Sequence, residues 1–435
     1  MTKISLSDIV LNPSCMDDYD PNSMPVDKAR TFISQFLSPV TNIENLSLRD
    51  TLGRVLATDI LSPCNVPNHD NSAMDGYAYN AESIVNSHIK ADGKTSLKVI
   101  GTAFAGKAFN DAVSLGECVR IMTGAVMPTA TDTVIMQERI TTVGNIITLN
   151  ETQKRGTNVR YAGEDLKLNQ VVLAAGHLMR PADLGLIASL GIAELPVFRK
   201  LKVAFFSTGD ELTQIGQPLA TGQIYDSNRY TLYGMLTRLG VEVIDMGVVR
   251  DDPALLESAL LEAAGQADVI LTTGGVSVGE ADYMKDLLAK HGQVLFWKIA
   301  MKPGRPLAFG KISTGQHTAH YFGLPGNPVS TMVTFYQFVR DAMLRLMGQD
   351  NPKPSPLLNA VCTADIKKLT GRTEFQRGIL YLAGDGHWQV KPVGSQGSGV
   401  LRSMSEANCF IVLDDTVGNI AAGATVQVQI LEGII

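Results

Sequence analysis

The stretch VILTTGGVSVGEADY, residues 269–283, joins an apolar run to a helix-like segment through a loop rich in glycine and acidic residues. Residues 269–271 have the continuous apolar character of a strand that is buried on both faces. The loop positions of interest are Gly274, Gly275, Ser277, Gly279, Glu280 and Asp282. Glycine lets backbone N–H groups approach an anion closely, and the N-terminus of a following helix adds partial positive charge. The loop is therefore predicted to hold something small and highly charged.

Two other glycine-bearing loops also follow strand-like runs. Residues 207–211 (STGDE) come after KVAFF, and residues 323–328 (GLPGNP) come after HYF. In open α/β sheets, ligands bind outside the carboxyl ends of the strands, so the three loops are expected on one rim. The predicted binding positions are Ser207, Gly209, Asp210, Gly274, Gly275, Ser277, Gly279, Gly326, Asn327, Pro328 and Ser330. For any one loop alone, an ordinary strand-to-helix turn is an equally good interpretation.

Carboxylates near this rim need a separate explanation, because they would repel a bare anion. The acidic positions are Glu211, Asp251, Glu280 and Asp282. A divalent cation between these groups and a phosphate would reconcile the charges, and Mg²⁺ prefers oxygen ligands shared in this way. Helix N-capping remains an equal alternative for Asp251 and for Asp282 taken singly.

A basic stretch, WKIAMKPGRP at residues 297–306, supplies positive charge close to the same loops. Surface lysines are usually solvated, but Lys298, Lys302 and Arg305 surround a Pro-Gly turn, which favours ligand contact. No histidine pair has metal-ligand spacing, no GxSxG occurs, and GLPGNPVS lacks the lysine of a Walker A loop. Zinc, serine-hydrolase and P-loop chemistry are therefore not expected.

The order of elements predicts several domains. A chain of 435 residues is long enough for two to four domains at roughly 100–200 residues each. From residue 200, strands and helices alternate, which implies βαβ units on a parallel, doubly wound sheet. The expected parts are a flexible tail (1–24), a mixed N-terminal linker domain (25–63 and 164–199), a β-rich insertion domain (64–163), an α/β domain (200–349) and a C-terminal β domain (350–435).

Composition indicates which classes of protein this chain is not expected to belong to. Hydrophobic residues make up 45% of the chain and charged residues 18%, and the net charge of −6 argues against nucleic acid as a partner. The five cysteines are scattered and form no CxxC, so neither a disulfide framework nor a zinc site is predicted. We see no signal peptide and no apolar run of ~18 residues, so a cytoplasmic protein without a membrane partner is expected.

Seven motifs in order carry a family resemblance: NSAMDGYA, MTGA, GED, STGDEL, TTGGVSVGEADY, KPGRP and GLPGNPVS. Together they resemble the MoeA-type molybdopterin molybdenumtransferases, a family that includes the E domain of gephyrin. The resemblance covers roughly residues 26–430. It implies an elongated four-domain homodimer whose α/β domain is similar to the Mog-type adenylyltransferases.

The resemblance also implies an activity, namely insertion of molybdate into adenylylated molybdopterin with release of AMP in a Mg²⁺-dependent step. By motif, the implied catalytic residues are Asp75, Thr123, Asp165, Glu211, Asp282, Lys298 and Lys302, and the metal ligands are Glu211, Asp251 and Asp282. Arg305 and Ser277 would help to bind molybdate, and Arg372 with Ser395 or Ser398 would reach the site from the last domain. Asp75 and Asp165 are expected to complete the partner subunit's site. The resemblance implies two kinds of protein partner: a Mog-type adenylyltransferase, and molybdoenzymes that accept the cofactor.

Two other functions are compatible with parts of the sequence. A Mog-type adenylyltransferase needs only the α/β domain, so the insertion containing NSAMDGYA and the C-terminal β region count against it. A gephyrin-like binding scaffold would leave the acidic and basic site without a role. The sequence favours the insertase, and it does not separate molybdate from tungstate, because these oxyanions have nearly the same size and charge.

Overall fold

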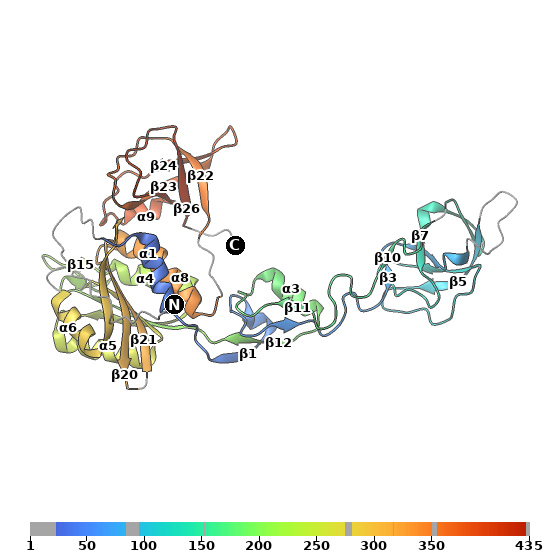
Figure 1. Ribbon diagram of the computed structural model, residues 1–435, viewed down its shortest axis with the longest axis horizontal. Helices are drawn as coiled ribbons and strands as arrows, with labels where there is room; N and C mark the ends of the chain where they lie inside the picture. The colour runs from blue at the N-terminus through green and yellow to red at the C-terminus, as the bar shows by residue number, and fades with distance from the viewer. Residues whose placement is uncertain are drawn as a thin grey trace. The chain divides into compact units, whose positions relative to one another are not determined.

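The computed structural model describes residues 23–83, 95–151, 153–274, 281–315, 317–349 and 355–431 (Figure 1). The chain divides into two compact units. Unit 1 comprises Met1–Asn45, Gly53–Ala57 and Pro196–Ile435, and unit 2 comprises Leu46–Leu52 and Thr58–Leu195.

A six-stranded sheet forms the centre of unit 1, in the order β16-β13-β17-β21-β20-β18. Its strands are β13 (Lys202–Thr208), β16 (Glu242–Val249), β17 (Val269–Thr273), β18 (Gly292–Lys298), β20 (Pro306–Thr314) and β21 (His317–Leu324). The first four strands in this order are parallel neighbours, whereas β20 pairs antiparallel with both β21 and β18. The predicted fold class is confirmed, but the expectation of an all-parallel sheet is wrong at this edge. Because β20 and β21 are joined by a short turn rather than a helix, strand–helix alternation did not reveal this hairpin.

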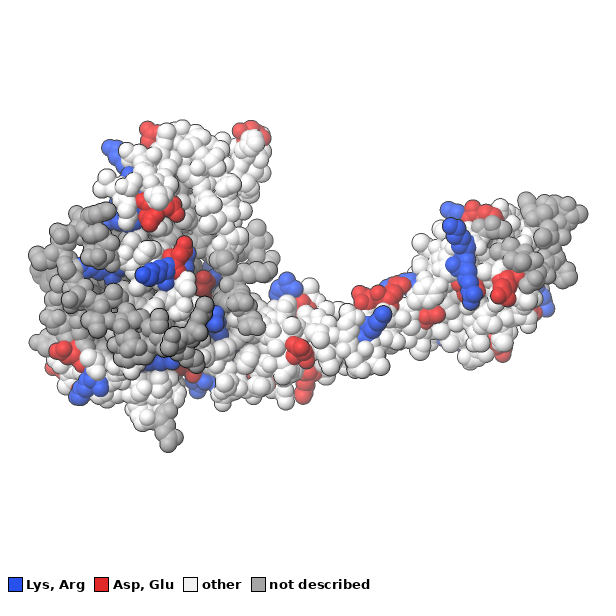
Figure 2. All heavy atoms as spheres, viewed as in Figure 1, with Lys and Arg blue, Asp and Glu red and all other residues white. Residues whose placement is uncertain are grey.

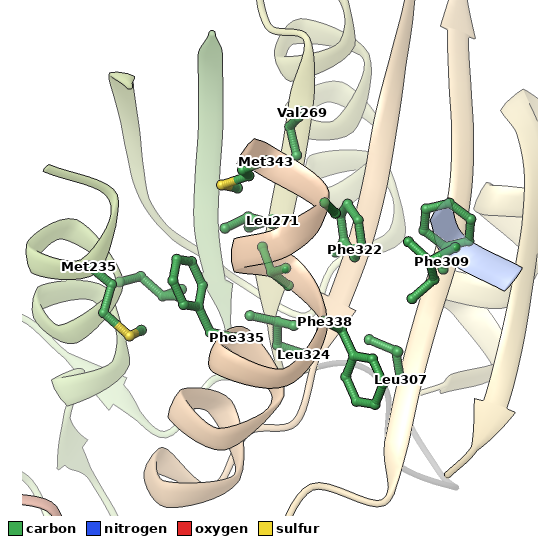
Figure 3. Packing of buried hydrophobic residues seen from close by; sticks show 14 of the residues in the cluster. Met235, Val269, Leu271, Leu307, Phe309, Phe322, Leu324, Phe335, Phe338 and Met343 are labelled. Carbon is green, nitrogen blue, oxygen red and sulfur yellow. The ribbon is translucent and has the colours of Figure 1, made fainter. Parts of the chain in front are cut away.

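Helices cover both faces of this sheet. They are α1 (Val26–Gln35), α4 (Ser227–Arg238), α5 (Pro253–Gln266), α6 (Ala281–His291), α7 (Pro328–Thr334) and α8 (Arg340–Leu346), with a π-helical segment (Phe335–Val339) between α7 and α8. Consecutive side chains of β13 point into the cores on opposite faces of the sheet. Phe205 packs with α1, α4 and the α7–α8 segment, and Phe206 packs with α5 and α6. Figure 3 shows Phe335 and Phe338 among the strand residues of the first core, such as Leu271.

Two helices of unit 1, α4 and α5, begin at an aspartate whose side chain caps the first turn. Asp226 caps α4 by accepting a hydrogen bond from the backbone N–H of Arg229 at 3.1 Å. Asp252 caps α5, accepting from the N–H groups of Ala254 and Leu255 at 3.0 Å each. Asp251 is therefore not the cap of α5, which removes the capping explanation for that residue.

The C-terminal part of unit 1 is a closed β structure. Its strands are β19 (Met301–Lys302), β22 (Leu357–Cys362), β23 (Thr373–Leu382), β24 (Trp388–Pro392), β25 (Cys409–Leu413) and β26 (Thr425–Ile430), and it carries α9 (Arg402–Glu406). The order β19-β23-β24-β22-β26-β25 is closed by pairing of β25 with β23. Strand β19 lies between β18 and β20 in the chain and pairs parallel with β23, so this β domain is attached directly to the α/β domain. Phe375 and Phe410 belong to the same core cluster as Phe335.

Unit 2 contains another six-stranded sheet, in the order β7-β4-β6-β5-β9-β8. Its strands are β4 (Gly76–Tyr79), β5 (Ser96–Ala103), β6 (Glu117–Ile121), β7 (Thr133–Met136), β8 (Ile140–Val143) and β9 (Ile146–Leu149). The remaining elements are α3 (Pro181–Ser189), two 3₁₀ turns (Leu48–Thr51 and Gln137–Arg139), and the pairs β2 (Ile60–Leu61) with β11 (Val171–Leu173) and β3 (Asn71–Ser72) with β10 (Val159–Arg160).

Two short strand pairs complete the described structure. They are β1 (Ile43–Ser47) with β12 (Glu194–Phe198), and β14 (Leu212–Thr213) with β15 (Ile224–Tyr225). Among the described residues, no helix is long and apolar enough to cross a membrane. On the face shown in Figure 2, basic and acidic side chains are interspersed, in keeping with the small net charge of −6.

Candidate functional site

A cavity of about 640 Å³ lies in unit 1 where the loops after β13, β17 and β21 meet. Six of the predicted binding or catalytic residues line it: Glu211, Gly274, Gly326, Asn327, Pro328 and Ser330. The loops come together because the carboxyl ends of neighbouring parallel strands share one edge of the sheet. The structure therefore brings the three glycine-bearing loops to one place, as the sequence indicated.

Asn228, in the first turn of α4, joins two of these loops, and sequence reasoning missed it. Its Nδ2 group donates hydrogen bonds to Thr273 Oγ1 at 2.9 Å and to the carbonyl of Gly326 at 2.7 Å. A backbone carbonyl can only accept, so this contact fixes the orientation of the amide. The residue is 8% exposed and lines the cavity. The DSN sequence at residues 226–228 is typical of a helix start and carries no other signal.

Three acidic residues gather around the loop that follows β13. Thr208 donates a short hydrogen bond from Oγ1 to Asp251 Oδ1, and the Asp251 N–H points to Asp210 Oδ1 at 3.4 Å. The carboxylate of Glu211 folds over Gly209, where a Cβ atom would lie 2.5 Å from Oε2. The backbone at Gly209 has a φ of +149°, a conformation that favours glycine. Of these three residues, only Glu211 is among the described residues that line the cavity, and Asp251 is bonded to Thr208, which also lines it.

Some predicted binding residues do not face the cavity, or lie outside the described residues. The Ser207 side chain is fully buried, and its Oγ has no hydrogen-bond partner among the described residues. Gly275, Ser277, Gly279 and Glu280 fall within residues 275–280, outside the described residues, as does the predicted tail up to residue 22. Asp282 is the second residue of α6, and its side chain is not among those described. Their roles stay predictions.

Glu211 and Asp251 are the predicted metal ligands whose side chains the structure describes. Among the described residues, no group of three or more His, Cys, Asp or Glu side chains is arranged to hold a metal ion. Mg²⁺ commonly takes only one or two carboxylates, with substrate phosphates and water completing its shell. The oxygen donors at the end of β13 are therefore compatible with Mg²⁺ held jointly with a phosphorylated ligand.

The basic stretch lies beside the cavity wall rather than in it. Pro306 lines the cavity, but Lys298, Lys302 and Arg305 do not. Lys302 Nζ lies 3.8 Å from Glu374 Oε1 of β23, a carboxylate whose side chain is only 3% exposed. Arg305 Nη2 donates to Ser23 Oγ at 3.3 Å.

In unit 2 the structure brings NSAMDGYA and MTGA together. Asp75 Oδ1 accepts hydrogen bonds from the backbone N–H of Thr123 at 2.7 Å and from Thr123 Oγ1 at 2.8 Å. The backbone bond and then the side-chain bond lower the pKa of Asp75 below its usual value. Asp165 is held by a backbone hydrogen bond from its N–H to the carbonyl of Val66 at 3.0 Å. In the described part of the chain, no hydrogen bond joins Asp165 to Asp75 or Thr123.

The C-terminal β domain also reaches the cavity. Gly399 and Leu401 line it, and the carbonyl of Ser398 accepts a hydrogen bond from the N–H of Val329 at 3.0 Å. Ser395, Ser398 and Arg372, which the resemblance placed near the site, are not among its lining residues.

Three family descriptions match consecutive parts of the chain. "MoeA N-terminal region (domain I and II)" matches residues 24–191, "Probable molybdopterin binding domain" matches residues 204–345, and "MoeA C-terminal region (domain IV)" matches residues 359–431. The cavity-lining loops after β13, β17 and β21 fall within the second match.

Curated relatives and solved structures agree with these matches. A Haemophilus influenzae protein named "Molybdopterin molybdenumtransferase" is 46% identical over 407 residues, covering 93% of this chain and 98% of that protein. Gephyrin of Dictyostelium discoideum is 32% identical, and the similarity covers 93% of this chain and 62% of that protein. A crystal structure of the molybdopterin biosynthesis MoeA protein from Pyrococcus horikoshii OT3 is similar with a TM-score of 0.80 at 29% identity, covering 94% of this chain and 100% of that one.

Proposed function

Since the chain belongs to the MoeA family of molybdopterin molybdenumtransferases, we propose that it inserts molybdate into adenylylated molybdopterin and releases AMP. The family resemblance and the enzyme class predicted from the seven motifs are confirmed. The observation that carries the detailed proposal is the cavity at the ends of β13, β17 and β21, with Glu211 in its wall and Asp251 bonded to the lining residue Thr208. A pyrophosphate-bridged nucleotide needs both backbone donors and a cation, and this arrangement can offer both.

Glu211 and Asp251, with Asp282 as the third predicted ligand, would hold Mg²⁺ against the pyrophosphate. When bound, the ion neutralises phosphate charge and polarises the phosphoanhydride that is hydrolysed. The chain itself orients the nucleotide, because Asn228 fixes Thr273 and Gly326 relative to the start of α4. Lys298, Lys302, Arg305 and Ser277 would attract molybdate, a tetrahedral dianion.

The two other functions are less well supported. A Mog-type adenylyltransferase would use only the α/β domain, whereas the family matches extend from residue 24 to residue 431. A scaffold role similar to that of gephyrin would not require the acidic group beside the cavity. We also propose that the protein is a cytoplasmic homodimer that receives its substrate from a Mog-type adenylyltransferase and serves molybdoenzymes.

A single-turnover assay tests the proposed reaction. Purified protein, adenylylated molybdopterin and Mg²⁺ are mixed with and without molybdate, and AMP release and the molybdenum content of the pterin are followed. We expect AMP release to depend on molybdate and to match molybdenum incorporation. Tight nucleotide binding without turnover would contradict the insertase and favour a carrier or scaffold.

A further inference from the structure

The segment before α1 runs along the edge of the central sheet. Strand β18 ends the order of that sheet and pairs, among the described strands, with β20 alone. Just beyond its end, Met24 forms a parallel bridge with Ile299. The N–H of Met24 donates to the carbonyl of Lys298 at 2.8 Å, and the N–H of Ala300 donates to the carbonyl of Met24 at 2.8 Å. A single residue thus continues the strand pairing at this point.

The sequence SMP at residues 23–25 explains why this pairing is one residue long. A residue that precedes proline is driven into extended conformations, which suits Met24 to pair like a strand. Pro25 has no N–H to donate, so a longer pairing would lose a hydrogen bond there. Helix α1 begins directly after Pro25, and its Phe32 packs edge-on against Trp297 with ring centroids 5.0 Å apart. The helix therefore fixes the position of the bridge.

The preceding residue, Ser23, contacts the other end of the basic stretch. Its Oγ accepts a hydrogen bond from Nη2 of Arg305 at 3.3 Å. The carbonyl of Arg305 in turn accepts from the N–H of Ile299 at 2.7 Å, which ties this end back to the end of β18. Pro306, which follows Arg305, lines the cavity. Ser23 and Met24 together therefore contact both ends of the basic stretch, next to the cavity wall.

The middle of the basic stretch is held from another side. Strand β19, which contains Lys302, pairs with β23 of the C-terminal β domain, and the N–H of Thr373 donates to the carbonyl of Ala300 at 2.9 Å. Lys302 therefore has a support that does not involve residues 23 and 24. The backbone at Lys298, by contrast, is bonded directly to the bridge. Loss of the bridge is expected to affect Lys298 and Arg305 more than Lys302.

We propose that Ser23 and Met24 are positioning residues for the reaction of this site, holding Lys298 and Arg305 beside the cavity for binding of molybdate. This inference rests on the proposed function, in which the basic stretch attracts molybdate. Lysine and arginine side chains lose much rotamer freedom when they bind an anion, and a backbone that is fixed beforehand lowers this entropic loss. Loosening the bridge is therefore expected to weaken molybdate binding more than it slows the bound complex.

Met24→Pro and Met24→Leu separate the backbone bridge from the side chain. Met24→Pro removes the N–H that donates to Lys298, whereas Met24→Leu keeps it and retains a similar apolar volume. We expect Met24→Pro to raise the Kd for molybdate in calorimetric titration, and the KM for molybdate, about tenfold each, while kcat changes less than about twofold. Hydrogen exchange of the Ala300 amide should accelerate, and exchange in β20 should not. Met24→Leu should match the wild type in all of these measurements.

Ser23→Ala and Ser23→Thr test the second contact, since threonine keeps the hydroxyl that accepts from Arg305. We expect Ser23→Ala to raise the Kd for molybdate about twofold to threefold, because one charge-assisted hydrogen bond is lost. Ser23→Thr should restore the wild-type value. If the two variants have the same Kd, Ser23 does not position Arg305 and this part of the proposal is wrong.

Unchanged molybdate affinity and unchanged exchange at Ala300 in Met24→Pro would overturn the proposal. An equal loss of affinity in Met24→Leu would also overturn it, because the side chain rather than the backbone would then be responsible. So would loss of protection throughout β18, β20 and β21, since Met24 would then only support the fold. A wild-type protein that binds molybdate without turnover would instead contradict the proposed reaction, and the molybdate titrations would still decide whether residues 23 and 24 position the basic stretch.

Discussion

Two neighbouring aspartates at the start of α5 have different partners. Asp251 accepts a hydrogen bond from Thr208 beside the cavity, whereas Asp252 caps the helix. We expect Asp251→Asn to raise the Mg²⁺ concentration needed for half-maximal turnover at least about tenfold, because one charged ligand is lost. Asp252→Asn keeps a good capping side chain and should leave both turnover and the melting temperature unchanged. Mg²⁺ titrations of AMP release measure the effect. Equal responses of the two variants would remove Asp251 from the metal site.

The hydrogen bonds from Thr123 affect the pKa of Asp75 and therefore the stability of the protein in acid. Thr123→Val deletes the side-chain bond and keeps the backbone bond, so the pKa of Asp75 should rise but stay below its ordinary value of 3.8. A carboxyl group whose pKa is lower in the folded than in the unfolded state stabilises the folded protein at pH values above its unfolded-state pKa. This stabilisation is lost as pH falls through the folded-state pKa. The variant should therefore be destabilised near neutral pH and indistinguishable from wild type in strong acid. Carboxyl NMR titration gives the pKa directly, and an unchanged curve would contradict this account.

At the scale of elements, two glycines of unit 2 should respond to alanine in opposite directions. A Cβ atom at Gly76 in β4 would lie 1.9 Å from the carbonyl oxygen of Ile135 in β7, so Gly76→Ala must push the two strands apart. We expect it to lower the free energy of unfolding by roughly 1–3 kcal/mol or more. Gly185 lies in α3 with open space around it, and Gly185→Ala should stabilise by roughly 0.5–1 kcal/mol. Chemical denaturation measures both, and the same sign for both would refute the steric explanation.

The elements also show which features a sequence reveals. Glycine loops after apolar runs predicted the rim of the sheet, because strand direction and turn chemistry are local properties. Asn228 could not be found in this way, since its partners Thr273 and Gly326 are far along the chain. The hairpin of β20 and β21 was missed because two short apolar runs do not reveal whether they pair parallel or antiparallel.

At the scale of the whole molecule, we propose that unit 2 of one subunit serves the site of its partner. Asp75 belongs to unit 2, whereas Asp282 belongs to unit 1, and both are in the motif set of the family. Mixing Asp75→Ala subunits with Asp282→Ala subunits separates the two possibilities. If each site takes these residues from different chains, every mixed dimer has one intact site, and random exchange should restore roughly a quarter of wild-type activity.

If each site instead takes both residues from one chain, every site in every dimer carries one lesion and no activity returns. Two affinity tags, one on each variant, establish that mixed dimers have formed before turnover is measured. The control mixes Asp75→Ala subunits bearing either tag, for which neither arrangement predicts recovery. Recovery in the mixed sample alone would therefore assign the aspartates to a shared site, and its absence despite proven exchange would confine the reaction to a single subunit.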